Sequence, residues 1–174
     1  ANSITLPIGG SNIDSFLSTP ESVKAISKLG ISAFFVGTLM KKDAFTLSES
    51  LKSLSVVNAC IDDGPVIALA SLLTVYEHIG RLSGTKACFL GNVTKHENLL
   101  YALSKCGADI TVVGEDAEEL FENCKQYSDV KPAIDPFVAA AKADLIYVDT
   151  ENEEYFLTDE IMAAAKDDCV ILHT

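Results

Sequence analysis

The stretch DDGPVIALASLL, residues 62 to 73, places two carboxylates and a Gly-Pro step directly before an apolar helix. Paired carboxylates could carry acid-base chemistry, because two neighbouring acids can hold different protonation states. At a helix start, however, aspartates commonly cap unpaired backbone N–H groups and favour the positive end of the helix dipole. We therefore interpret Asp62 and Asp63 as caps, and the step Gly64-Pro65 as the turn into the helix.

The three histidines could act as bases or ligands, but none stands beside a recognisable partner. His96 follows the turn that begins at Gly91, His78 lies near a helix end and His173 follows a strand. The turn at Gly91 opens a helix that could receive an anion, yet it lacks the G-x-G-x-x-G spacing of dinucleotide sites. There is also no G-x-S-x-G elbow, H-E-x-x-H motif, P-loop or EF-hand spacing. We therefore expect no nicotinamide or flavin cofactor and no metal.

Apolar runs that alternate with helical patterns must position these residues. Short continuous runs predict parallel strands buried on both faces, which we expect at Ala33 to Val36, Val56 to Ala59, Ala87 to Leu90, Ile110 to Val113, Leu145 to Val148 and Cys169 to Leu172. Helices are expected between them, at Pro20 to Leu29, Ala44 to Leu54, Pro65 to Ile79, Glu97 to Cys106, Ala117 to Gln126, Pro136 to Lys142 and Thr158 to Lys166. Strict alternation predicts an α/β fold with parallel sheets.

The segment HIGRLSGTK, residues 78 to 86, has the composition of a boundary, because a long apolar helix ends there in Gly, Arg, Ser and Gly before a new strand begins. We therefore expect two parallel-sheet α/β lobes joined by a long helix. The expected bounds are residues 1–64 for the first lobe, 65–80 for the helix and 81–174 for the second lobe.

Composition narrows the classes of partner. The 174 residues include 13 basic and 25 acidic side chains, a net charge of -12 that repels phosphate backbones and anionic lipids. No apolar run reaches the roughly 20 residues that a membrane-spanning helix needs. The five cysteines are odd in number and widely spaced, which favours reduced thiols over disulfides or zinc ligands. We expect a soluble intracellular protein that binds neither nucleic acid nor membranes.

The order of segments resembles the transcarbamoylases, above all the ornithine enzymes. The resemblance rests on SVVNACIDDGPVIALASLLTVYEHIGRLSGTKACFLGN, then LLYALSKCGADITVV and ADLIYVDT. The family pattern there is a D-x-x-H-P-x-Q-x-L-A-D loop and helix, then L-T-I-x-E-x-x-G-x-L-x-G and a strand ending in V-G-D. The resemblance implies a partial carbamoyl-phosphate lobe followed by a Rossmann-like amino-acid lobe.

The family's carbamoyl contacts can be carried over one position at a time. The His and Gln of the H-P-x-Q loop, which contact the carbamoyl group in the family, fall on Gly64 and Ile67, while Pro65 keeps the helix frame. The Arg that ends the family strand D-A-I-V-I-R falls on Gly37. Each of these three replacements lacks a side-chain donor. The family's S-T-R-T-R phosphate loop has no counterpart.

On the amino-acid side, part of the family pattern is kept. The motif D-x-W-x-S-M-G aligns with DTENEEYF and keeps Asp149, but neither the Ser nor the Met-Gly. The motif H-C-L-P begins as LHT, which keeps His173 and places Thr174 at the Cys position. The resemblance therefore implies that Pro65, Asp149 and His173 are what is left of the substrate site.

Losing one preorganised donor costs ~3 to 4 kcal/mol of transition-state stabilisation, so three losses approach ~9 kcal/mol. Enzymatic rate enhancement is worth ~8 to 23 kcal/mol in total. We therefore expect no catalytic residues and an inactive relative that serves as a structural or interaction subunit of a larger assembly. Two alternatives stay open: an active ornithine-type carbamoyltransferase completed by other segments or subunits, and a module that senses a small metabolite.

The expected partners are other protein subunits, and a small anion or an amino acid could still bind. The family resemblance and the reduced cysteines fit the cytoplasm or the mitochondrial matrix.

Overall fold

The computed structural model describes residues 25, 28–31, 33–37, 45, 48–49, 54–59, 65–93, 97–114, 117–124, 130–149 and 153–173. The chain divides into two compact units, Ala1–Val66 and Ile67–Thr174. The bounds of lobes and linking helix that the sequence suggests stay a prediction. The helices expected at 20 to 29 and 44 to 54 lie largely outside the described residues.

In the first unit, two short strands form a parallel pair. These are β1 (Ala33–Val36) and β2 (Ser55–Asn58), with Val36 opposite Asn58 at the carboxyl end. Both strands lie within a residue of their expected positions, since runs such as AFFV have the β-branched and aromatic content typical of strands.

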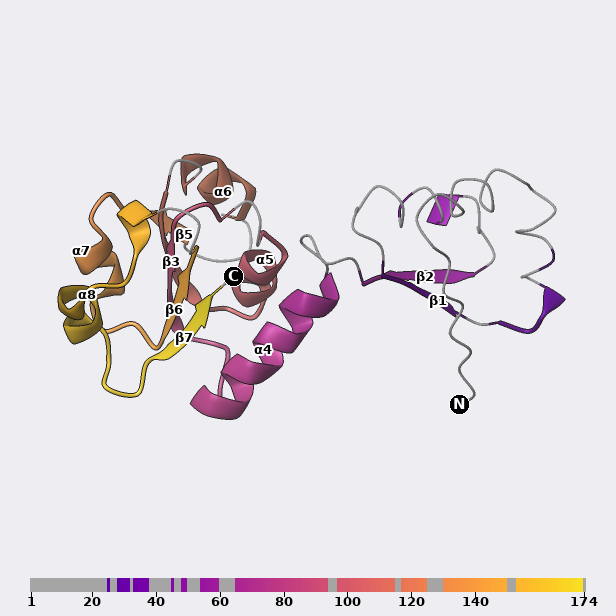
Figure 1. The fold of residues 1–174 in the computed structure, drawn as a ribbon, viewed down its shortest axis with the longest axis horizontal. Helices are drawn as coiled ribbons and strands as arrows, with labels where there is room; N and C mark the ends of the chain where they lie inside the picture. Colours follow the sequence, from indigo (N-terminus) through magenta and orange to yellow (C-terminus); the bar gives the residue numbers. More distant parts are fainter. Residues whose placement is uncertain are drawn as a thin grey trace. The chain divides into compact units, whose positions relative to one another are not determined.

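The second unit is built on a five-stranded parallel sheet in the order β5-β4-β3-β6-β7 (Figure 1). Its strands are β3 (Lys86–Leu90), β4 (Asp109–Val113), β5 (Val130–Pro132), β6 (Leu145–Val148) and β7 (Val170–His173). The helices are α4 (Pro65–Ile79), α5 (Glu97–Lys105), α6 (Ala117–Cys124), α7 (Pro136–Ala140) and α8 (Asp159–Ala164), with a 3-10 turn η2 (Glu153–Tyr155). The expected α/β class with parallel sheets is confirmed.

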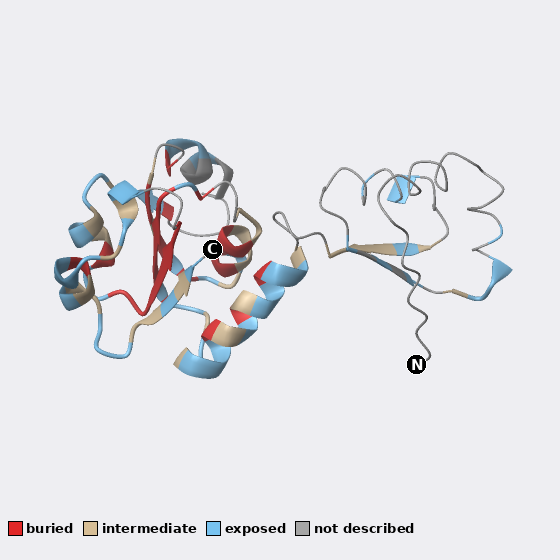
Figure 2. Ribbon diagram, in the orientation of Figure 1, coloured by how far each residue is buried: buried red, intermediate tan, exposed pale blue. Residues whose placement is uncertain are grey.

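Two hydrophobic clusters cover the two faces of this sheet. Side chains of α4, α5 and α6 pack with Phe89 and Tyr147 on one face, while α7 and α8 pack with Cys88 and Ile146 on the other. The strands β3 and β6 are buried along almost their whole length (Figure 2). Continuous apolar runs such as LIYV are the sequence consequence of this two-sided cover.

Local sequence explains how individual helices begin and end. Helix α4 buries Ala68, Leu72 and Val75, a spacing of four and three residues that places all three on one face. It stops at Gly80, whose φ of +78° is the left-handed conformation typical of a helix C-terminus. The amide of Ile161 donates to the Thr158 hydroxyl at 3.3 Å, which caps α8.

Candidate functional site

The carboxyl ends of β3, β6 and β7 lie side by side, and Asn92, Asp149 and His173 are found at these three ends. Leu90 is opposite Val148, and Val148 is opposite His173. The amide of Asp149 continues the ladder by donating to the Leu90 carbonyl at 2.9 Å. We call the trio Asn92, Asp149 and His173 the carboxyl-end site.

This location is where open parallel sheets bind ligands. The chain moves outward from β3 through β4 to β5 and then returns to the other side of β3 as β6. The connections on the two sides of β3 therefore pack on opposite sheet faces, as the helix clusters show. Such a switch in strand order leaves a crevice at the carboxyl ends of the two central strands.

Asp149 is the buried centre of the carboxyl-end site, with only 2% of its surface exposed. Its Oδ2 accepts a hydrogen bond from the backbone N–H of Asn92 at 3.2 Å. A carboxylate removed from water needs such donors to offset its lost hydration. Asp149 therefore fixes the turn that follows β3 and holds Asn92 beside the end of β6.

Two glycines let these strand ends approach closely. Gly91 has φ of +100°, and a Cβ placed there would lie 2.7 Å from Asp149 Cβ and 3.5 Å from Tyr155 Cδ2. A Cβ on Gly114, after β4, would lie 2.3 Å from the Gly91 carbonyl oxygen. Distances under 3 Å are clashes, so both positions require glycine.

The exposed groups at these strand ends could contact a ligand. Asn92 and His173 are exposed, whereas Gly91 and Asp149 are buried. An amide, an imidazole and a carboxylate offer donors and acceptors for a polar ligand, and an imidazole can accept a proton near neutral pH. The carboxylate also acts on its neighbour, since burial and then the charge of Asp149 raise the pKa of Tyr147 well above its usual range.

The structure places the other residues suggested by the sequence as follows. Pro65 is the first residue of α4, and Ile67 lies on the same helix with 46% of its surface exposed. Gly37 directly follows β1, and a Cβ there would meet only the Ala59 carbonyl oxygen at 3.8 Å. Some of the positions named from the sequence lie outside the described residues: Asp62, Asp63, Gly64, His96 and Thr174. The assignments of Gly37, Ile67, Pro65, Asp149 and His173 as substrate-site positions stay predictions.

Three residues of this region were not singled out in the sequence: Asn92, Gly114 and Tyr155. A glycine at the carboxyl end of two successive strands, in FLGN and TVVG, is the available signal for the first two. Tyr155 has no such signal, because its proximity to Gly91 depends on the η2 turn.

A cavity of about 230 Å³ lies at the opposite end of the strands, near the amino ends of β3 and β4. It is lined by residues at the starts of β3 and β4, by β5 and by the α7 region, including Lys86, Asp109 and Lys131. The cavity and the carboxyl-end site are separated by the length of strands of four to five residues, which rise about 3.3 Å per residue. The cavity is therefore not the candidate substrate site.

Several proteins named for an enzymatic activity are similar in sequence to this chain. The ornithine carbamoyltransferase of Cenarchaeum symbiosum (strain A) is 30% identical over an alignment of 190 positions, gaps included. The alignment covers 98% of this chain and 62% of the relative. The ornithine carbamoyltransferase of Geobacillus stearothermophilus is 31% identical over 140 residues, covering 64% of this chain and 44% of the relative. The chain belongs to the transcarbamoylase family. It spans less than two thirds of the length of these relatives.

Solved structures agree with the transcarbamoylase fold. Ornithine carbamoyltransferase from Pyrococcus furiosus matches with a TM-score of 0.72 at 24% identity, covering 88% of this chain and 57% of that protein. A mitochondrial ornithine carbamoyltransferase from Coccidioides immitis matches with a TM-score of 0.68 at 23% identity, covering 97% and 59%. No protein-family profile matches the chain.

The expectation that this transcarbamoylase relative is not an enzyme is wrong, because the relatives are named for an enzymatic activity. The expectation counted only side-chain donors at three aligned positions. Backbone groups or another subunit can also donate, and the second unit keeps Asp149 and His173 at adjacent strand ends. Missing side chains at Gly37, Gly64 and Ile67 do not by themselves exclude catalysis.

No helix among the described residues is long and apolar enough to cross a bilayer. The compartment and the identity of any partner stay predictions.

Proposed function

We propose that this chain takes part in carbamoyl transfer to ornithine or a related amino acid, with its second unit supplying the amino-acid side of the site. One observation carries the proposal: the buried Asp149 holds the turn after β3 at the switch point of the parallel sheet, and the exposed His173 ends the neighbouring strand β7. The relatives named ornithine carbamoyltransferase support this choice of reaction.

The chemistry of the trio suits the amino-acid substrate. In carbamoyl transfer an amine nitrogen bonds to the carbamoyl carbon, the bond from that carbon to the phosphate oxygen breaks, and the amine loses a proton. An exposed imidazole at His173 can accept that proton, because a neutral imidazole carries one acceptor nitrogen. The net charge of -12 also favours the approach of ornithine, which carries two ammonium groups.

Asp149 has an indirect role in this proposal. Its carboxylate is buried and accepts from the Asn92 backbone N–H, so it orients the turn after β3 that carries the exposed Asn92 side chain.

Side chains of this chain do not match the family's carbamoyl contacts at the aligned positions that the structure describes. Gly37 and Ile67 offer no side-chain donors, and each missing donor costs about 3 to 4 kcal/mol of transition-state stabilisation. We therefore propose that backbone groups or a neighbouring subunit supply these contacts. Exposed apolar side chains on α4, at Leu69, Leu73 and Tyr76, support association with another protein surface.

Reduced cysteines support a reducing compartment, the cytoplasm or the mitochondrial matrix. Among the described residues, Cys88, Cys106 and Cys169 are free thiols.

The test is citrulline formation from carbamoyl phosphate and ornithine by the native assembly that contains this chain. His173→Ala should abolish citrulline formation, whereas His78→Ala should leave it unchanged, because His78 is exposed and its ring bonds the Thr74 carbonyl of its own helix. Equal activity of the two variants, or no citrulline from the native assembly, would contradict the proposal. Ornithine binding without citrulline would favour the metabolite-sensing alternative instead.

A further inference from the structure

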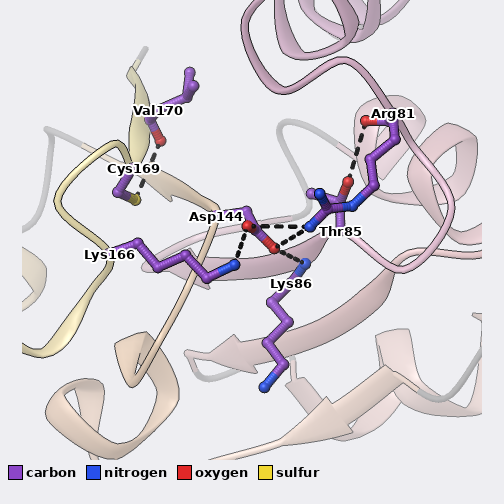
Figure 3. A network of polar contacts seen from close by, with 7 residues as sticks. All are labelled: Arg81, Thr85, Lys86, Asp144, Lys166, Cys169 and Val170. Carbon is purple, nitrogen blue, oxygen red and sulfur yellow. Dashed lines mark hydrogen bonds and ion pairs between the residues drawn. The ribbon is translucent and has the colours of Figure 1, made fainter.

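The most connected polar group in the described part of the second unit is the carboxylate of Asp144, at the amino end of β6. Asp144 is 6% exposed, and three donors surround it (Figure 3). Lys166 Nζ donates to Oδ1, the Lys86 backbone N–H donates to Oδ2 at 2.9 Å, and Arg81 Nη2 lies 3.3 and 3.4 Å from the two oxygens. We call Arg81, Lys86, Asp144 and Lys166 the Asp144 junction.

The electrostatics of this junction keep Asp144 charged. Burial alone raises the pKa of a carboxyl group, but hydrogen bonds from Lys166 and Lys86 and the charges of Lys166 and Arg81 outweigh it. The pKa of Asp144 therefore lies below its usual value. A buried ion pair often adds little net stability compared with apolar side chains, and it is better suited to specifying one register.

The backbone of Asp144 also connects three strands, β3, β6 and β7. Its amide donates to the Lys86 carbonyl on β3 at 2.8 Å, and its carbonyl accepts from the Val170 amide, the first residue of β7, at 2.9 Å. Lys166, four residues before β7, adds a backbone bond to Ala143 at 3.2 Å. Asp144 therefore connects β3 and β7 to the start of β6 through its main chain, and its side chain ties β3 to Lys166 in the segment before β7.

These strands are the ones that carry the carboxyl-end site at their other ends. β7 is at the edge of the sheet and pairs only with β6 among the described strands, so its position depends strongly on how its first residues are fastened. β7 has four residues, so Val170 and His173 are the two ends of one short strand.

We infer that Asp144 is a positioning residue: it fastens β6 and the edge strand β7 to β3 at their amino ends, and thereby sets the spacing of Asn92, Asp149 and His173. Calling this spacing functional rests on the proposed amino-acid site. The geometric effect itself can be measured in the protein without any ligand.

The experiment compares amide hydrogen exchange by NMR in the full chain and in Asp144→Asn. Exchange at Asn92 and Asp149 should accelerate about tenfold or more, and the His173 ring resonances should shift. The internal reference is the Ala133 amide, which bonds the Val112 carbonyl on the β4 side of the sheet and should change much less. A uniform acceleration at all three amides would overturn the inference, since it would mean that Asp144 only stabilises the fold.

Matched variants separate positioning from stability. Thr158→Ala removes the cap of α8 without touching the junction, so at equal loss of stability it should not accelerate Asn92 and Asp149 selectively. If Asp144→Asn does not fold, Lys166→Met replaces it, with Lys166→Arg expected to restore the wild-type pattern because it keeps the charge. Selective acceleration in Thr158→Ala, or none in Lys166→Met, would contradict the inference.

A ligand titration distinguishes this inference from the proposed function. If wild-type protein binds ornithine, Asp144→Asn should bind it about tenfold more weakly. If wild-type protein binds no ornithine, the proposed function fails, while the exchange data still decide the role of Asp144.

Discussion

Replacing Gly91 by alanine should destabilise the second unit far more than the same change at Gly80. Both glycines have positive φ, +100° at Gly91 and +78° at Gly80, so alanine costs each about 1 to 2 kcal/mol in backbone strain. A Cβ at Gly80 meets nothing within 4 Å, whereas at Gly91 it lies 2.7 Å from Asp149 Cβ. Such overpacking adds about 1 to 3 kcal/mol.

The expected losses are therefore about 1 to 2 kcal/mol for Gly80→Ala and about 2 to 5 kcal/mol for Gly91→Ala. Urea unfolding followed by far-ultraviolet circular dichroism measures the difference. With a slope of about 2 kcal/mol per molar urea, a difference of about 2 kcal/mol separates the two midpoints by about 1 M. Equal midpoints would show that Gly91 and Asp149 do not approach as closely as described, and the compact carboxyl-end site would be refuted.

Three further predictions concern the same unit. Because the pKa of Asp144 is lowered in the folded chain, the stability that its carboxylate contributes is fully present above about pH 4 and is lost as pH falls through the lowered pKa. In Asp144→Asn, the urea midpoint of unfolding should therefore fall less between about pH 4 and lower pH than it does in the wild type. Burial and the nearby Cys169 raise the pKa of Cys88 to about 12, so peptide mapping after iodoacetamide treatment at pH 8 should find Cys88 unmodified until urea is added. Thr158→Ala should cost about 1 kcal/mol of unfolding free energy, and no change in the urea midpoint would contradict the capping contact.

Much of the fold of the second unit follows from local sequence. Continuous apolar runs such as KACFL and LIYV give strands buried on both faces, and the expected and observed bounds differ by a residue or so. The sequence pattern does not predict β5, because Val130–Pro132 contains a lysine and a proline. Proline in a sheet is confined to edge strands, first residues of strands and bulges. Helix α7 ends two residues earlier than expected. Lys142 has a φ of +59°, and a right-handed helix requires a negative φ.

The candidate site depends more on long-range contacts than the fold does. Asp149 and His173 could be proposed because the sequence resembles a family motif at both positions. The bond from the Asn92 amide to Asp149 joins residues 57 apart, and no local pattern encodes it. The Asp144 junction likewise joins Arg81 and Lys166 from distant segments, so its partners become visible only when the strands are assembled.

The most direct test of the central claim is an NMR titration of the isotope-labelled chain with ornithine. Binding at the carboxyl-end site should shift the amide resonances of Asn92 and Asp149 and the ring resonances of His173, and Asp149→Asn should abolish these shifts. Shifts centred instead on Lys86 and Lys131 would place the ligand in the cavity at the opposite end of the strands. That result, or no shift in the labelled chain, would contradict the assignment of the amino-acid site.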